Sequence, residues 1–421
     1  MKKQLKYLAE NKFVQGGFFL TASNFLVGFL NYLFNSLSGK FLGPEKYSEI
    51  VAVFAYLWVL TVPSQVITTD LIRRLGTKGK ERLATAKIWE QWFIKKIRHW
   101  WWLLIPYVLF IFFLPTLTNL SLLFSFVLSI TFLLSFVGVF YTSSLLGLHL
   151  FITYSLILIF STLIKLIGPI LVSFHIGGLT TIAILLVLSS AVLILLGKIA
   201  FNRILIPDFS NKKNLEKRII HYVFNKNIIV TGLSLVGITL LNNLDIIFVK
   251  KMFAPNLAGI YGSWSLFGKI IFYILSPILG LSYIFFSAKE QQKNHSKVIT
   301  FSLILLSVLG LILYVIYLMF GKFLVLLMFN ENYFQIIRYL PQAAIFGIFY
   351  TIITFLNNFF ISKNSRLSLI ITVLIFFYAG GLFLFGQSME LVIIVNIAFS
   401  FVCVFVYLAA TIKSNLDPKS S

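Results

Sequence analysis

The sequence has few charged residues for its length. Of its 421 residues 11% are charged, with 13 acidic side chains in all, whereas 59% are hydrophobic and the mean hydropathy is +0.94. Soluble globular chains carry about 25% charged residues, so a chain this poor in charge cannot cover a surface exposed to water. The composition therefore excludes a soluble globular domain and indicates a polytopic membrane protein.

Cysteine is almost absent, and motifs for metal binding and catalysis are missing as well. The single cysteine, Cys403, excludes an internal disulfide and a cysteine-rich metal site. The five histidines are too scattered for metal ligation. No phosphate-binding loop occurs, and no two carboxylates are placed for general acid–base catalysis. The sequence therefore predicts a protein that is not an enzyme and that has no catalytic residue, cofactor or metal.

Long apolar stretches extend from one end of the chain to the other. A helix needs about 20 apolar residues to cross about 30 Å of hydrocarbon. These stretches are continuously apolar and do not alternate, which favours helices over a β-barrel. We predict an all-α protein with twelve transmembrane helices, near residues 13–38, 47–72, 100–115, 120–147, 150–175, 180–200, 227–250, 257–287, 297–320, 340–361, 367–386 and 389–412.

Basic residues are distributed unevenly between the connections. With the N-terminus inside, the inner segments hold 27 Lys and Arg and the outer segments hold 6. The positive-inside rule then predicts a multi-pass protein of the cytoplasmic (inner) membrane with both termini in the cytoplasm. We attribute the net charge of +22 to this topology and to anionic membrane lipid at the cytoplasmic face, and not to nucleic acid.

The outer loops are all short, which argues against an external catalytic domain. The two long connections, 73–99 and 201–226, are both on the predicted cytoplasmic side. The first spaces Trp89, Phe93 and Ile97 four residues apart, among lysines and arginines. This pattern is typical either of a short helix on the membrane surface or of an ordinary basic loop whose tryptophans mark the interface.

An internal repeat divides the chain near its middle. Three matched pairs are each separated by 211 residues: Asn31 and Asn242, Lys40 and Lys251, Pro44 and Pro255. Six spans in each half give both halves the same orientation, which predicts two parallel-repeat six-helix bundles with a substrate path between them. We assign residues 1–200 to an N-terminal lobe, 201–226 to a cytoplasmic linker and 227–421 to a C-terminal lobe.

The hairpin after the first span carries a family resemblance. Phe41-Leu42-Gly43-Pro44-Glu45-Lys46-Tyr47 resembles the corresponding hairpin of Wzx-type oligosaccharide flippases, and the stretch from Asp245 through Gly259-Ile260-Tyr261 to Lys269 resembles the seventh-to-eighth helix region. These proteins form the polysaccharide-export branch of the multidrug/oligosaccharidyl-lipid/polysaccharide (MOP) superfamily, whose twelve-span plan covers the whole chain. The sequence departs from the family at Lys40, where arginine is frequent, and at Ser48-Glu49-Ile50, which lacks the usual Gly-x-Tyr.

Three charged residues are predicted to lie inside the membrane. Lys165 lies roughly 15 Å deep in the fifth span and Lys269 roughly 18 Å deep in the eighth, at a rise of 1.5 Å per residue. Such charges cost at least about 2.5–3.5 kcal/mol on insertion scales and usually mark a pathway. Each lysine should therefore face a substrate cavity or a structural ion-pair partner. Asp245, in the seventh span, is a candidate for that partner or for binding a coupling cation.

Asparagines add a polar stripe to two of the predicted helices. Asn24, Asn31 and Asn35 are separated by seven and four residues and share one face of the first span, and Asn242 occupies the matching place in the seventh. Such a stripe either lines a substrate cavity or forms hydrogen bonds between helices. We include all four, with Lys165 and Lys269, among the candidate substrate-binding residues.

The resemblance implies a flippase for lipid-linked oligosaccharide, with a polyprenyl-diphosphate glycan as substrate and polysaccharide-assembly proteins as further partners. Two deep lysines would then neutralise the diphosphate. Three alternatives remain at this stage. One is a multidrug/cation antiporter of the same superfamily, one is a membrane-embedded glycan polymerase or glycosyltransferase, and one is a membrane scaffold without transport activity.

Overall fold

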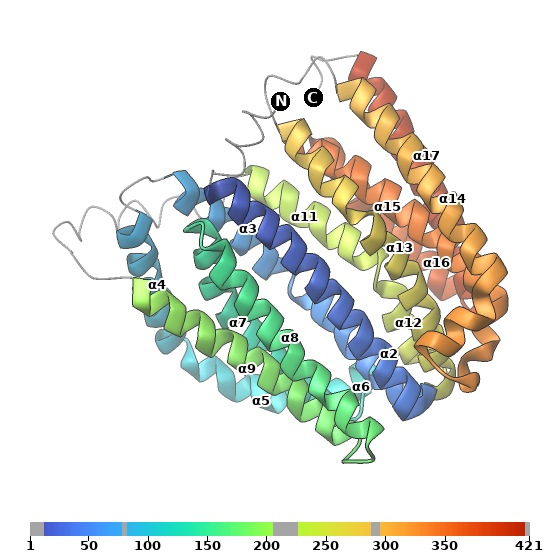
Figure 1. Ribbon diagram of the computed structural model, residues 1–421, viewed down its shortest axis with the longest axis horizontal. Coiled ribbons are helices and arrows are strands. Elements are labelled where there is room, and N and C mark those ends of the chain that lie inside the picture. The colour runs from blue at the N-terminus through green and yellow to red at the C-terminus, as the bar shows by residue number, and fades with distance from the viewer. Residues whose placement is uncertain (1–11, 78–81, 205–225, 288–294, 417–421) are drawn as a thin grey trace. The chain divides into compact units, whose positions relative to one another are not determined.

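The computed structural model describes residues 12–77, 82–204, 226–287 and 295–416 (Figure 1). Within these ranges every regular element is a helix and no strand occurs. Helices satisfy their own backbone hydrogen bonds, as apolar stretches surrounded by lipid require. The prediction of an all-α membrane protein is therefore confirmed.

Contacts divide the chain into two compact units, which are described separately. Unit 1 comprises residues 1–41 and 63–225, and unit 2 comprises 42–62 and 226–421. The helix α2 (Lys12–Leu60) contributes to both. The other helices of unit 1 are α3 (Val62–Thr77), α4 (Arg82–His99), η2 (Trp101–Leu103), α5 (Leu104–Ile111), α6 (Leu114–Thr118), α7 (Leu122–Gly147), α8 (Phe151–Ser173) and α9 (Leu179–Ile204).

Unit 2 holds the helices of the second half of the chain. They are α11 (Lys226–Leu241), α12 (Leu244–Met252), α13 (Pro255–Ser287), α14 (His295–Met328), η4 (Glu331–Tyr339), α15 (Leu340–Ser362), η5 (Arg366–Leu369), α16 (Ile370–Phe385) and α17 (Met389–Leu416). Residues 42–62, which we assigned by sequence to the N-terminal lobe, pack with these helices. The predicted linker lies outside the described residues except at its ends, and the lobe boundaries 1–200 and 227–421 stay a prediction.

Among the described residues, eight helices are long and apolar enough to cross a membrane, or up to ten if each of two bent pairs forms one span. The sequence-based count of twelve exceeds this for two reasons. First, α2 consists of two helices that meet at a kink at Gly43, with φ 78° and ψ 170°; they correspond to the predicted spans 13–38 and 47–72, but they enter the count as part of one bent pair. Glycine adopts positive φ without a Cβ clash, and Pro44 has no N–H to continue the preceding helix.

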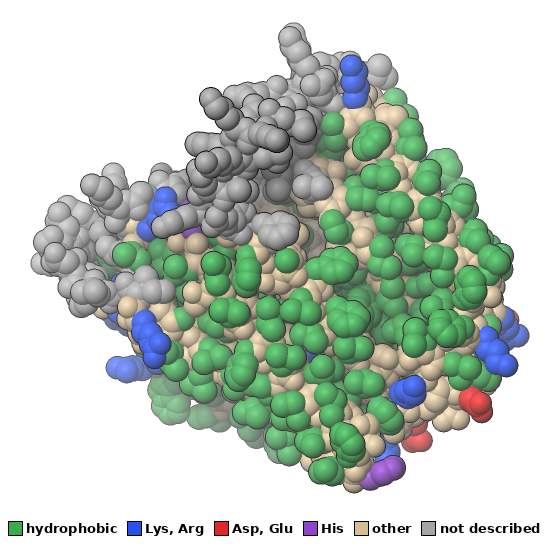
Figure 2. Space-filling model, viewed as in Figure 1, with side chains coloured by type: hydrophobic (Ala, Val, Ile, Leu, Met, Phe, Trp, Pro, Cys, Tyr) green, Lys and Arg blue, Asp and Glu red, His purple; other side chains and the backbone are tan. Residues whose placement is uncertain are grey.

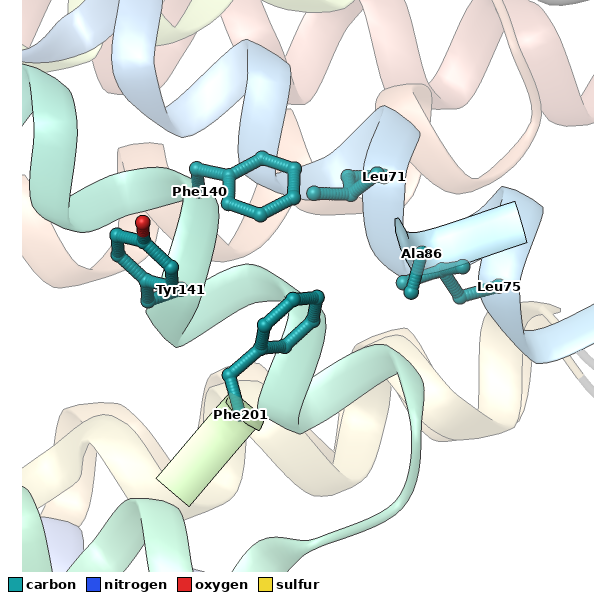
Figure 3. Packing of buried hydrophobic residues seen from close by; sticks show 6 residues of the cluster. All are labelled: Leu71, Leu75, Ala86, Phe140, Tyr141 and Phe201. Atoms are coloured by element: carbon teal, nitrogen blue, oxygen red, sulfur yellow. The ribbon is translucent and has the colours of Figure 1, made fainter. Parts of the chain in front are cut away.

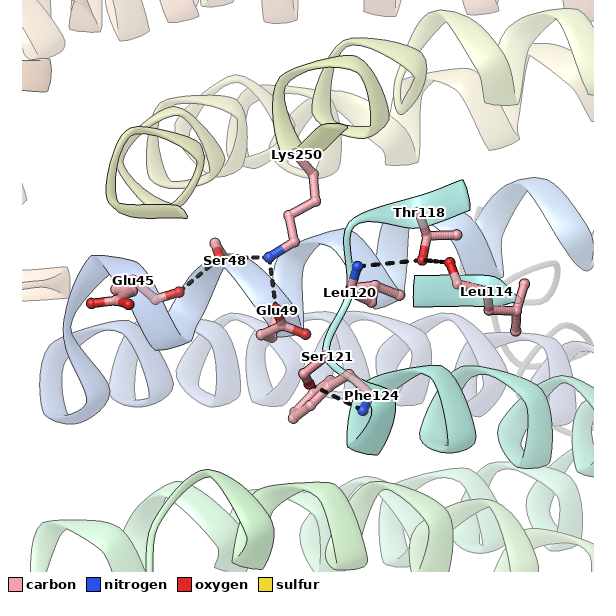
Figure 4. A network of polar contacts seen from close by, with 9 residues as sticks. All are labelled: Glu45, Ser48, Glu49, Leu114, Thr118, Leu120, Ser121, Phe124 and Lys250. Atoms are coloured by element: carbon pink, nitrogen blue, oxygen red, sulfur yellow. Dashed lines mark hydrogen bonds and ion pairs between the residues drawn. The ribbon is translucent and has the colours of Figure 1, made fainter. Parts of the chain in front are cut away.

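The second reason is that the predicted third span, near residues 100–115, does not form one long helix. This region forms three short helices, η2, α5 and α6, none of which is long enough to cross a membrane. Pro115 stands at the start of α6, and Asn119 ends it in the left-handed conformation with φ 55°. Figure 4 includes the turn that follows, where the Ser121 hydroxyl accepts from the Phe124 N–H and starts α7.

The predicted cytoplasmic segment 73–99 contains a true helix, α4. Ala86 on its inner face joins Leu71, Phe140 and Phe201 in a buried hydrophobic cluster, and Trp89 packs against that cluster (Figure 3). The segment is therefore helical, and Trp89 and Phe93 of its apolar face pack on protein, whereas Ile97 is exposed; its place on the membrane surface stays a prediction. Its last turn carries Lys96, Arg98 and His99.

Phe201 is fully buried in this cluster, with its ring centroid 5.7 Å from that of Phe140 and 5.8 Å from that of Tyr141. We expect Phe201→Ala to lower the free energy of unfolding by about 3–5 kcal/mol, because it leaves a cavity in a core that anchors α4. Thermal unfolding in detergent measures this loss. The matched control is Ile199→Ala, at an exposed position two residues earlier on α9. Equal stability of the two variants would contradict the prediction.

Apolar side chains dominate the exposed surface. Hydrophobic residues cover most of the face shown in Figure 2. Phe376, Phe377 and Phe383 on α16 are each more than 70% exposed. Large apolar patches of this kind mark surfaces that are covered by another apolar phase. Together with the long apolar helices, they make this a multi-pass membrane protein.

Candidate functional site

Lys165 lies on α8, in unit 1, and is half-buried. Its ammonium donates a hydrogen bond to the side-chain oxygen of Asn31 on α2. The same ammonium lies 5.2 Å from the ring centroid of the buried Phe34, one helical turn further along α2. An amide oxygen and an aromatic face both stabilise a cation without cancelling its charge. The structure therefore brings together two of the predicted site residues, Lys165 and Asn31.

The other two asparagines of α2 have different environments. The Asn35 amide donates to the backbone carbonyl of Asn31 at 2.8 Å, so it bonds within its own helix. Asn24 lies on the exposed surface. The three side chains share one helix face, as their spacing predicts, and it is the Asn31 oxygen that accepts the hydrogen bond from Lys165.

Lys269 occupies a comparable environment in unit 2. This half-buried residue of α13 donates to the Asn243 side-chain oxygen at 3.0 Å. The Asn243 amide in turn donates to the Thr239 carbonyl at 2.8 Å, which orients the asparagine. In each unit, therefore, a lysine within a predicted span binds an asparagine from the first predicted span of that half of the chain.

Asn243 lies at a break in the seventh predicted span. Helices α11 and α12 meet there at a bend of 47°, with Asn242 and Asn243 between them. Sequence reasoning selected Asn242 as the site residue because of its 211-residue match to Asn31. The structure gives the contact with Lys269 to Asn243, and the buried Asn242 side-chain oxygen has no hydrogen-bond partner among the described residues. The adjacent asparagines were the only sequence signal for the break.

Asp245 is fully buried in the first turn of α12, within what we call the aspartate cluster (Asp245, Tyr261, Tyr378 and Asn396). Its Oδ2 accepts from the Tyr261 hydroxyl at 2.6 Å and from the Asn396 amide at 3.2 Å. The Tyr378 hydroxyl donates to the Asn396 oxygen. The second carboxylate oxygen, Oδ1, has no hydrogen-bond partner among the described residues.

Within the described ranges, no ion pair involves the aspartate cluster. In the part of the chain that the structure describes, the ion pairs are Lys87–Glu90, Lys250–Glu49 and Arg338–Glu390. Lys269, the predicted partner, instead binds Asn243. Sequence reasoning missed Asn396 and Tyr378. Asn396 could have been found in the sequence as a lone asparagine within the apolar stretch 389–412.

A second charged residue of α12 is also buried. Lys250 is 2% exposed, and its ammonium lies 2.7 Å from Glu49 and 3.0 Å from the Ser48 hydroxyl (Figure 4). Lys250 is the last residue of the seventh predicted span, 227–250. Ser48 and Glu49 belong to one of the two places at which the sequence departs from the Wzx-type pattern.

Over the four described ranges, no three His, Cys, Asp or Glu side chains are grouped closely enough to hold a metal ion. The polar groups gathered inside the units are instead two lysine–asparagine contacts and one carboxylate held by hydroxyl and amide groups. Such groups bind anions and small monovalent cations or protons by charge and hydrogen bonding.

Comparison with known proteins places this geometry in a known fold. No protein-family model and no curated protein matches the sequence. Among solved structures, an inward-facing multidrug resistance MATE family transporter of the MOP superfamily aligns with a TM-score of 0.69 at 15% identity, covering 93% of this chain and 96% of its own. The lipid II flippase MurJ, in an inward closed conformation, aligns with a TM-score of 0.69 at 16% identity, covering 94% of this chain and 87% of its own.

An outward-facing MATE family transporter also aligns over 98% of both chains, with a TM-score of 0.61 at 16% identity. Identities at this level establish the fold and leave the substrate open. The chain therefore has the fold that MATE transporters share with the lipid II flippase MurJ, the fold of the MOP superfamily.

Proposed function

We propose that this protein flips lipid-linked oligosaccharide, carried on a polyprenyl diphosphate, across the cytoplasmic membrane for cell-surface polysaccharide synthesis. One observation carries the proposal. Lys165 and Lys269 lie within predicted spans, and each is bound by an asparagine oxygen. The Lys165 ammonium also lies 5.2 Å from the ring centroid of Phe34. Lysines held inside the helical units by amide oxygens are suited to bind an anionic head group.

The chemistry of the substrate fits these side chains. Opposite charges about 4 Å apart attract by about 4 kcal/mol at an effective dielectric constant of about 20. Asn24, Asn31, Asn35 and Asn242 would offer hydrogen bonds to sugar hydroxyls, while the polyprenyl chain stays in lipid. Transport would proceed by alternating access as the two six-helix lobes, 1–200 and 227–421, rock about the 201–226 linker.

The Wzx-type resemblance supports this substrate class, and the fold shared with a lipid II flippase is compatible with it. In the proposed topology both termini lie in the cytoplasm, where the basic segments contact anionic lipid. Polysaccharide-assembly proteins would be the partners that supply and receive the glycan. We assign no enzymatic step to the chain itself.

A multidrug/cation antiporter is the second candidate, and the aspartate cluster favours it. A buried carboxylate with one open oxygen is suited to a cation or a proton, and MATE transporters share the fold. In a flippase the same carboxylate would bind the coupling ion. Both functions therefore assign Asp245 to coupling, and they differ in the cargo.

Transport by the purified chain in proteoliposomes distinguishes the two cargoes. We expect a fluorescent polyprenyl-diphosphate oligosaccharide to become accessible to an externally added quencher, and a permeant organic cation such as ethidium to be neither accumulated nor expelled. Liposomes without protein are the control for spontaneous flipping. Ethidium transport without movement of the lipid-linked glycan would establish the antiporter instead.

Asp245→Asn tests coupling. Asparagine keeps the size of the side chain and can still accept a hydrogen bond from Tyr261, but it cannot bind a cation by charge. We expect transport in this variant to become independent of an imposed proton or sodium gradient, and to fall to the rate that the unmodified protein shows with the gradient dissipated. If gradients stimulate the variant and the unmodified protein equally, Asp245 has only a structural role.

A further inference from the structure

Residues 44–60, the second half of α2, form part of unit 2 although they precede it by more than 160 residues in the sequence. Tyr47 is fully buried, with its ring centroid 5.7 Å from Phe329 and 6.3 Å from Tyr333. Ala52 and Val53 are also fully buried. The segment is therefore packed as tightly as an ordinary core helix.

Helix α13 accepts this segment through two glycines. A Cβ atom at Gly259 would collide with the backbone carbonyl of Pro44, and one at Gly262 would lie 2.9 Å from a methyl carbon of Val51. The absence of these side chains lets the two helices approach closely. Residues 44–60 therefore pack closely on α13 through apolar contacts.

A buried ion pair is added to this packing. Lys250 of α12 binds Glu49 and Ser48 on the segment, and the Ser48 hydroxyl also donates to the Glu45 carbonyl at 2.7 Å (Figure 4). Lys250 is 2% and Glu49 13% exposed. A buried pair is often no more stabilising than apolar residues of the same size, so it is weak evidence for permanent packing. It differs from apolar packing in that water can solvate both charges when they separate.

The chain can bend at both ends of the segment. Gly43, with φ 78°, precedes it, and no atom lies within 4 Å of where a Cβ would be. At the other end α2 stops at Leu60 and α3 begins at Val62, so Thr61 interrupts the helix. Pro63 follows and has no N–H to donate across this break. These are also the points at which the chain passes between the two units.

We propose that residues 44–60 are a latch, which the Lys250–Glu49 ion pair holds on α12 and α13 and which detaches during each transport cycle by bending at Gly43 and Thr61. The proposal rests on the transport function proposed above. While the latch is closed, Ala52 and Val53 are inaccessible. When it detaches, the two charges become hydrated and these residues become accessible to water.

Thiol labelling measures latch opening without any substrate. In a Cys403→Ala background, Ala52→Cys places a thiol at a fully buried position of the latch, and Ala344→Cys places one at a fully buried position of α15 as a matched control. We expect N-ethylmaleimide to label Ala52→Cys faster than Ala344→Cys. Glu49→Gln should accelerate the labelling of Ala52→Cys by about tenfold or more, because Lys250 then loses its countercharge. The labelling of Ala344→Cys should stay unchanged. The exchanged pair Glu49→Lys with Lys250→Glu should restore slow labelling.

A disulfide tests whether opening is needed for transport. The 3.2 Å between a Cβ at Gly262 and the Val51 Cβ is a few tenths of an ångström below the Cβ separation of a disulfide, about 3.5–4.5 Å, so Val51→Cys with Gly262→Cys should crosslink the latch to α13 after a small shift of the helices. We expect the oxidised protein to lose transport and the same protein to regain it after reduction. The single variant Val51→Cys, treated identically, should transport normally.

The outcomes separate the latch from the proposed cargo. Equal labelling of Ala52→Cys and Ala344→Cys, with no acceleration by Glu49→Gln, would overturn the latch, and so would full transport by the oxidised double-cysteine protein. If the reduced protein moves no lipid-linked oligosaccharide while Glu49→Gln still accelerates Ala52→Cys labelling, the cargo is wrong and the latch stands.

Discussion

Replacement of Lys269 by alanine is expected to abolish transport of the lipid-linked glycan while membrane abundance stays normal. The variant removes the cation bound by Asn243 and leaves a neutral asparagine that keeps its bond to Thr239. An ammonium–phosphate attraction of about 4 kcal/mol corresponds to a decrease of several hundredfold, so export should fall by at least about a hundredfold. Lys165→Ala should have a similar effect, because it removes the cation bound by Asn31.

Glycan export in cells that lack the chromosomal copy measures this effect, with membrane abundance determined in parallel. Lys269→Arg keeps the charge and should retain part of the activity. Lys251→Ala is the matched control, because this exposed lysine lies outside the site. Normal export in both Lys165→Ala and Lys269→Ala would exclude a cationic binding site for the diphosphate.

Gly259→Val should prevent unit 2 from assembling correctly. Its side chain would meet the backbone of Pro44, which cannot move aside as a flexible side chain can. Overpacking in a core typically costs about 1–3 kcal/mol, and more where backbone must shift. Glycine in a helix interior is itself unfavourable by about 1 kcal/mol, so without this contact a substitution would tend to stabilise α13. The expected result is therefore a large loss of folded protein in the membrane.

Fluorescence-detected size-exclusion chromatography after stepwise heating measures this loss. Gly280→Val is the control on the same helix, because a Cβ there would have no atom within 4 Å. Comparable thermal stability of the two variants would show that residues 44–60 do not pack on α13 as the structure describes.

Much of the candidate site was visible in the sequence. Lys165, Lys269 and Asp245 stand out because charges are rare in apolar stretches, and the structure places all three inside helical units. Their partners were not predictable in the same way. Asn242 and Asn243 differ by about 100° around a helix axis, and the break between α11 and α12 determines which of them faces Lys269.

Lys250 and the third predicted span show where local patterns fail. Lys250 resembles an ordinary lysine at the end of a span, and its burial depends on Glu49, which is 201 residues away in the sequence. Residues 100–115 are apolar enough to span, yet they form three short helices. Window-based hydropathy measures only average transfer free energy, and it does not detect the turns that end a helix.

Membrane location, helical structure and the presence of buried cations follow from composition and order along the chain, because the transfer of apolar and charged groups into lipid depends mainly on the residue itself. The tertiary structure was needed to show that Asn31 and Asn243 bind the lysines, that Asp245 has no ion pair among the described residues, and that residues 44–60 pack with unit 2. Each of these depends on contacts between segments distant in sequence, whose strength is set by helix rotation, bending and close packing.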